Sequence, residues 1–246
     1  MRPLVFALLA ALLSSPAQAD FSKSDLEKIG KKVWQNECAG TIEGLTSWNA
    51  GEDFASLGIG HFIWYPQEKR GPFEESFPKL VAFAEAHGEK PPVWAHGACP
   101  WNARAEFQRD LHGERMNALR KFLANTITLQ TQFLVQRMHD ALPKMIEQTG
   151  QRERVRRNFE RLSESSRGVF ALIDYTNFKG EGTLATERYK DDGWGLLQVL
   201  ETMSGDDVRA FSDAAKKVLA RRVQNSPPGR HEERWLAGWK SRVESY

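Results

Sequence analysis

Apolar residues that recur at three- and four-residue steps are the feature that most constrains how this chain folds. The pattern runs through residues 127–146, 155–162, 169–178 and 196–203. Such spacing gives each helix one apolar face, which leaves water only by packing against other helices. The pattern therefore predicts a mainly helical body, and 246 residues are enough to bury a substantial core.

A further helix is expected near the beginning of the chain. Leu26, Ile29 and Val33 lie at helical spacing, the segment 24–27 (Ser-Asp-Leu-Glu) is typical of a capping box, and Gly40 is placed to end the helix. We therefore expect this helix over residues 25–39.

Residues 41–65 differ from the rest of the chain. Four glycines, the turn-like Asn49-Ala50-Gly51 and the aromatic and β-branched run 59–65 favour short strands joined by tight turns. A loop at 66–72 and a helix at 77–87, with Pro78 in its first turn, should follow. We expect a single domain over residues 20–246, a helical body with one small β hairpin in a β lobe at 41–65.

The first nineteen residues predict export. Arg2 precedes an apolar run at 4–13 that is too short to cross a bilayer, and Ala17 and Ala19 supply the small residues that a signal peptidase recognises. The mature chain is then expected in the periplasm or secreted, without a stable membrane span. A short uncleaved anchor is the alternative.

Export gives a meaning to the two cysteines, Cys38 and Cys99. An oxidising compartment favours a disulfide between them, and closing a loop of about sixty residues would contribute roughly 4 kcal/mol in the chain-entropy model. The alternative is Cys38 as a nucleophile served by His61.

Several classes of function are disfavoured. The net charge of +2 provides little of the field that a nucleic-acid binder carries, so no nucleic-acid partner is expected. The six histidines and two cysteines lack metal-ligand spacing, and no phosphate-binding glycine loop or serine-hydrolase elbow occurs. No metal or cofactor is expected, and the arginine-rich run at 152–161 is interpreted as a solvated helix face.

Glu37 is the residue most indicative of chemistry. It lies four residues after Val33, so a carboxylate takes the next place on the apolar face of the first helix. The negative end of the helix and partial desolvation both oppose its ionisation there, which is the condition that a general acid requires. In the alternative, Glu37 turns to solvent or pairs with a nearby arginine.

Glu37 followed by a hairpin that closes on Ser56-Leu57-Gly58-Ile59-Gly60-His61 resembles the phage-type lysozymes. Their pattern is a catalytic glutamate, an aspartate in the hairpin, and then Thr-x-Gly-x-Gly-His. The resemblance covers about 25 residues and implies a lysozyme-like α+β fold, with Glu37 as proton donor to a glycosidic oxygen. It places Ser56 where the family threonine positions the attacking water, and His61 where a structural histidine braces the hairpin.

The family aspartate has no counterpart at its own position, because Ala50 lies six residues before Ser56. Glu52 is the nearest carboxylate that could act as base or stabilise an oxocarbenium-like transition state, and Asp53 is second. If neither reaches the cleft, a single-acid mechanism of the lytic-transglycosylase kind is favoured.

Other polar and aromatic residues are candidates for binding sugar hydroxyls, N-acetyl groups and ring faces. The segment 194–199 is loosely similar to the Gly-Leu-Met-Gln run of lytic transglycosylases. The substrate-binding candidates are Trp48, Asn49, His61, Tyr175, Asn177, Trp194 and Gln198.

The resemblance implies cleavage of peptidoglycan glycan strands. The alternatives are a non-catalytic cell-wall or partner-binding protein, and a glycosidase for another amino-sugar polymer such as chitosan.

Overall fold

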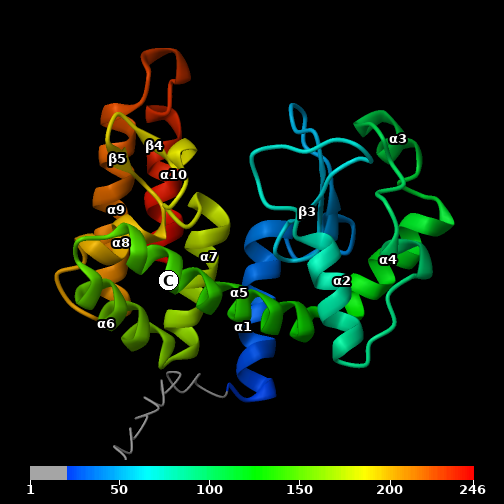
Figure 1. The fold of residues 1–246 in the computed structure, drawn as a ribbon, viewed down its shortest axis with the longest axis horizontal. Coiled ribbons are helices and arrows are strands. Elements are labelled where there is room, and N and C mark those ends of the chain that lie inside the picture. The colour runs from blue at the N-terminus through cyan, green and yellow to red at the C-terminus, as the bar shows by residue number, and fades with distance from the viewer. Residues whose placement is uncertain (1–20) are drawn as a thin grey trace, which may run out of the picture.

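The computed structural model describes residues 21–246, so the expected export signal at 1–19 lies outside the described residues. Ten α-helices and two small antiparallel sheets make up this part of the chain (Figure 1). The mainly helical fold class is therefore confirmed. Within the same residues, no helix combines the length and the apolar character that a membrane span needs.

Two helices, α1 (Lys23–Cys38) and α5 (Ile127–Gln148), pack on each other at the centre of the molecule. Gly30 permits this approach, because a Cβ at that position would lie 2.3 Å from Thr131 Oγ1 of α5. The apolar stripe of α1 is buried as its spacing predicted. The expected capping box at 24–27 is wrong, because Ser22 caps the helix by accepting a hydrogen bond from the Asp25 amide at 3.1 Å.

Residues 42–125 form one lobe, which we call the sheet lobe. Its three strands, β1 (Thr46–Ser47), β2 (Ala55–Leu57) and β3 (Phe62–Trp64), pair in that order. The expected hairpin therefore carries one strand more than predicted. Helices α2 (Phe77–Ala86), α3 (Arg104–Arg109) and α4 (Glu114–Asn125) complete the lobe, together with 3₁₀ turns at Glu43–Leu45 and Val93–His96.

The turn between β2 and β3 is held against α5. Gly58 has φ +70°, and a Cβ there would lie 2.4 Å from Gln130 Oε1. That oxygen instead accepts a hydrogen bond from the Ile59 amide at 3.0 Å. The glycine thus lets the backbone approach the α5 side chain, which fixes the sheet on the central helix.

Residues 151–246 form the second lobe, which we call the helical lobe (Figure 1). Its helices are α6 (Arg152–Ser163), α7 (Ser166–Lys179), α8 (Leu196–Thr202), α9 (Val208–Asn225) and α10 (Glu233–Glu244), with 3₁₀ turns at Ala185–Glu187 and Pro228–Arg230. The arginines of α6 are exposed, while Val155 and Phe159 are buried.

The helical lobe also contains an unexpected two-stranded hairpin, β4 (Arg188–Tyr189) with β5 (Asp192–Gly193). The expectation of a single β segment was wrong because strands of two residues are too short to give an alternating pattern. The buried apolar side chains of both lobes nevertheless belong to one contiguous core cluster.

The expected disulfide between Cys38 and Cys99 is not present, and both thiols are free and buried. They lie in separate hydrogen-bonded surroundings: Cys38 Sγ donates to the Gly58 carbonyl at 3.6 Å, and Cys99 Sγ donates to the Trp101 carbonyl at 3.5 Å. Burial raises the pKa of each thiol to about 12. Since the thiolate is the reactive form, this environment also opposes Cys38 as a nucleophile.

Candidate active site

A cleft of about 1110 Å³ lies between the two lobes and above α5. The sheet lobe, the middle and C-terminal half of α5, and the end of α7 with the following loop all contribute to its lining. The residues that line it and bear on the predicted site are Asn49, Glu52, Ser56, His61, Asn177, Lys179, Trp194 and Arg222. Its volume exceeds that of most single-ligand pockets, so it has room for an oligomeric substrate.

Glu37 lies in the last turn of α1, with its side chain 11% exposed. Its Oε1 accepts a hydrogen bond from Arg242 Nη2 of α10, and its Oε2 lies 3.4 Å from His61 Nδ1. Glu37 itself does not line the cleft, but it contacts His61, which does. The alternative in which Glu37 pairs with an arginine is therefore the observed arrangement.

Arg242 also binds a second carboxylate, that of Asp174 in α7. Its Nε donates to Asp174 Oδ2 at 2.8 Å and its Nη2 to Oδ1 at 2.9 Å. Burial lowers the pKa of Arg242, but hydrogen bonding to Asp174 and the charge of Glu37 outweigh burial, so the pKa is raised overall. The guanidinium therefore remains charged and joins α1, α7 and α10 at one point.

Asp174 is fully buried and has four hydrogen bonds. Two come from Arg242, one from Asn36 Nδ2 at 3.0 Å and one from the Tyr246 hydroxyl at 2.7 Å. Buried carboxylates are stable only when paired and hydrogen-bonded, as this one is. Asp174 thus anchors Arg242, which in turn orients Glu37.

Sequence reasoning did not identify Arg242 and Asp174 as site residues. Arg242 follows Trp239 by three positions, so it continues an apolar stripe with a charge, just as Glu37 does. Asp174 interrupts the apolar run 169–178. A charged residue on an apolar helix face was therefore the signal in all three positions.

His61 and Ser56 both line the cleft from the sheet lobe. His61 has φ +46° in the turn after β2, and its side chain is 32% exposed. Ser56 lies in β2 and lines the cleft although only 3% of it is exposed. Both residues therefore belong to the sheet-lobe wall of the cleft, and His61 is also in contact with Glu37.

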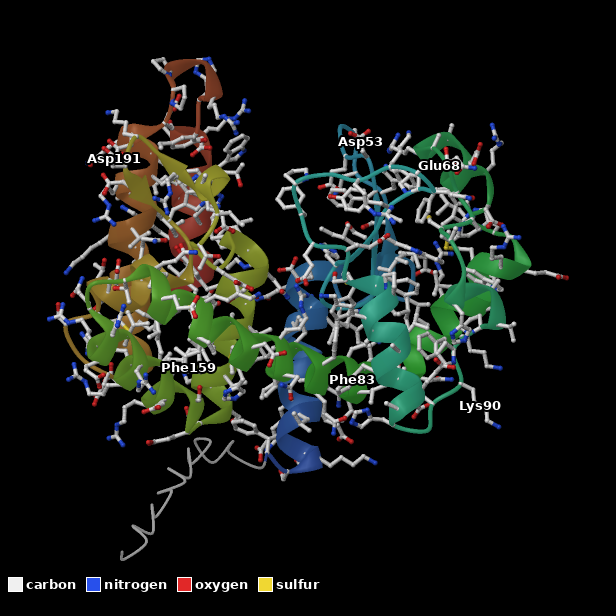
Figure 2. All side chains as sticks on the ribbon, viewed as in Figure 1. Asp53, Glu68, Phe83, Lys90, Phe159 and Asp191 are labelled. Atoms are coloured by element: carbon white, nitrogen blue, oxygen red, sulfur yellow. The ribbon has the colours of Figure 1, made fainter. Side chains whose placement is uncertain are left out.

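Glu52 is the hairpin carboxylate that lines the cleft, and its Oε2 accepts a hydrogen bond from Asn49 Nδ2 at 3.1 Å. Asp53 does not line the cleft. Figure 2 shows Asp53 at the outer end of the sheet lobe, where it is exposed. Of the two candidates to replace the missing aspartate, the structure brings Glu52 to the cleft.

Asn177 and Trp194 line the cleft from the helical lobe, as do His61 and Asn49 from the sheet lobe. The Nδ2 of Asn177 is buried and has no hydrogen-bond partner among the described residues. Since a buried unsatisfied donor costs free energy, a ligand acceptor at this position would be favoured.

Three of the substrate-binding candidates, Trp48, Tyr175 and Gln198, are not brought to the cleft. Trp48 is buried, and its indole donates to the Glu52 carbonyl at 2.8 Å. Tyr175 is fully buried and donates to the Trp194 carbonyl at 2.9 Å. The amide of Gln198 bonds the backbone of Gly182 and Gly195. Each polar atom is already used in holding the fold.

Residues 21–246 contain no group of three or more metal-ligating side chains that could hold a metal ion. Comparison of the chain with protein-family models, with curated proteins and with solved structures found no match. The assignment of chemistry to this cleft therefore depends on its geometry: a carboxylate in the cleft, Glu52, a mostly buried Glu37 behind His61, and polar and aromatic groups on both walls.

Proposed function

We propose that the protein is a glycosidase that cleaves the glycan strands of peptidoglycan, with Glu37 as the general acid. The observation that carries the proposal is the position of Glu37, a mostly buried carboxylate held between Arg242 and His61 beside a cleft wide enough for an oligosaccharide. Export, which the segment 1–19 predicts, would bring the enzyme to this substrate.

The hydrogen bonds distinguish the two carboxylates that Arg242 binds. Asp174 accepts four hydrogen bonds, whereas Glu37 accepts one, from Arg242. Asp174 is thus fully engaged in holding Arg242, whereas the second oxygen of Glu37 lies beside His61, a residue of the cleft, so the acid role is assigned to Glu37.

Glu52 and Ser56 supply the second half of the proposed chemistry. Both line the cleft on the hairpin wall. Glu52 would activate water or stabilise an oxocarbenium-like transition state, and Ser56 would help to position the water. In the alternative, a lytic transglycosylase reaction, Glu37 would still be the acid and a hydroxyl of the sugar itself would attack.

The test is release of soluble muropeptides from isolated sacculi by the purified mature protein. Glu37→Gln should lose about 10²- to 10⁴-fold in rate, the usual contribution of a general acid. Glu43→Gln is the matched control, since Glu43 is exposed and does not line the cleft. Unchanged turnover in Glu37→Gln would refute the acid role, and anhydro ends on the products would identify transglycosylation.

The same assay tests the other two candidate functions. Binding to sacculi without fragment release would indicate the non-catalytic protein. Faster cleavage of chitosan than of sacculi would indicate an enzyme for another amino-sugar polymer. Either result would refute the proposed peptidoglycan activity.

A further inference from the structure

Lys179, the last residue of α7, is a buried lysine that the proposed mechanism does not use. It lines the cleft, yet only 8% of it is exposed. Its ammonium lies 3.9 Å from the ring centre of Phe178 and 3.4 Å from that of Trp239. Among residues 21–246, no carboxylate forms an ion pair with it and no acceptor takes a hydrogen bond from it. A cationic side chain this deeply buried usually has a partner, so the missing one points to a ligand.

The charges around Lys179 favour an anion as that ligand. Arg222 of α9, Arg242 of α10 and the carboxylate of Glu232 are the charged groups coupled to it. The Glu232 carboxylate is occupied by Arg222, which donates to its two oxygens at 2.8 Å each, and by the Tyr189 hydroxyl. Arg242 is likewise occupied by Glu37 and Asp174. Lys179 is therefore the basic side chain of this group that has no acidic partner.

The position of Lys179 relates it to the proposed acid. Phe178 contacts both Lys179 and Arg242, since the Arg242 guanidinium lies 4.4 Å from the Phe178 ring centre. Trp239 in turn contacts Lys179 and Arg222. Lys179 thus lies on the helical-lobe wall of the cleft, where a group on a bound sugar can reach it, and the Phe178 ring connects it to Arg242 behind that wall.

We propose that Lys179 binds a carboxylate carried on the substrate glycan, so that the cleft selects muramic-acid-containing strands over neutral or cationic amino-sugar polymers. The inference rests on the proposed glycosidase function and names the feature of the substrate that the cleft recognises. A muramyl residue differs from N-acetylglucosamine by its lactyl group, which ends in a carboxylate or continues into a peptide that bears carboxylates.

Binding of such a carboxylate would take up a proton. Burial, with a smaller effect from Arg222, lowers the pKa of Lys179 to about 6, so the free amine is largely neutral at neutral pH. A carboxylate beside it stabilises the ammonium form. Affinity for a carboxylated glycan should therefore be greatest below about pH 6 and fall as the pH rises, by about tenfold per pH unit at most.

Two sugars separate recognition of the carboxylate from recognition of the backbone. One is the tetrasaccharide of alternating N-acetylglucosamine and N-acetylmuramic acid, and the other is chitotetraose, which has the same backbone without carboxylates. Titration calorimetry at pH 6 and pH 8, with Glu37→Gln as the background so that no sugar is cut, measures both affinities. In this background the muramyl tetrasaccharide should bind more tightly than chitotetraose, and only its affinity should fall between the two pH values.

Adding Lys179→Met should weaken binding of the muramyl tetrasaccharide about 10- to 100-fold, as expected for loss of a charge-assisted hydrogen bond, and remove its pH dependence. Lys32→Met is the control, because Lys32 also lies over an aromatic ring, 5.0 Å from the centre of Phe170, but does not line the cleft. Equal affinity for the two sugars, or equal losses in the two lysine variants, would overturn the inference. If the muramyl sugar binds through Lys179 but active protein never cuts it, the anion site stands and the glycosidase proposal fails.

Discussion

Replacing Arg242 with methionine tests whether the Glu37, Arg242 and Asp174 cluster holds the site together. The change removes two of the four hydrogen bonds to Asp174, which is fully buried, and leaves its charge unpaired. Breaking a buried ion pair by removing one partner typically costs about 3–5 kcal/mol. Because Asn36 and Tyr246 still donate to Asp174, we expect the lower end, about 3 kcal/mol, which corresponds to a fall in Tm of about 6–12 °C for a chain of this size.

The free energy of unfolding is measured by urea denaturation followed by circular dichroism. Arg161→Met is the control, since Arg161 forms exposed ion pairs with Glu164 and Asp206 and should leave the midpoint unchanged. Combining Arg242→Met with Asp174→Asn should recover about 1–2 kcal/mol, because the neutral amide needs no counter-charge. A loss in Arg242→Met no larger than in Arg161→Met would refute the structural role of the cluster.

Three further predictions concern the buried amine, the thiols and the second carboxylate. Lys179→Met should stabilise the protein at pH 6. The pKa of Lys179 is about 6 in the fold and near 10.5 when unfolded. The free-energy cost of burying this side chain is therefore greatest below pH 6 and decreases as the pH rises to about 10.5. Thermal unfolding at pH 6 and pH 9 should show the larger gain at pH 6, and an equal gain at both would contradict the assignment. Thiol titration should find Cys38 and Cys99 reactive only after denaturation, whereas fewer than two thiols would reveal a disulfide. Glu52→Gln should slow hydrolysis of sacculi, and a normal rate would remove Glu52 as base.

Local patterns predicted the small sheet of the first lobe, one half of the candidate site, and the helices α1, α2, α5, α6, α7 and α8. The apolar stripe of α1 identified Glu37 as an anomaly, and the glycine-rich turn identified Ser56 and His61 on the wall of the cleft. These features depend on neighbours within a few residues, which periodicity and turn chemistry describe well. Strands β4 and β5 have two residues each, which is too short to show an alternating pattern.

The other half of the site depends on contacts between distant parts of the chain. Arg242 follows Glu37 by 205 residues and Asp174 by 68 residues, so no local pattern links them. The disulfide prediction failed for the same reason, because redox environment alone does not decide whether two cysteines meet. Trp48 and Tyr175 show a second limit of sequence-based prediction. An aromatic residue that packs in the core and one that stacks on a sugar look alike in the sequence.

The leaving-group dependence of Glu37→Gln tests the proposed acid role most directly. Dinitrophenolate leaves without a proton, whereas a sugar hydroxyl requires one, so a general acid matters only for the second. We predict that Glu37→Gln releases dinitrophenolate from an activated oligosaccharide at close to the wild-type rate, while its cleavage of the corresponding sugar-to-sugar bond falls about 10²- to 10⁴-fold. Equal losses with both leaving groups would contradict Glu37 as the proton donor.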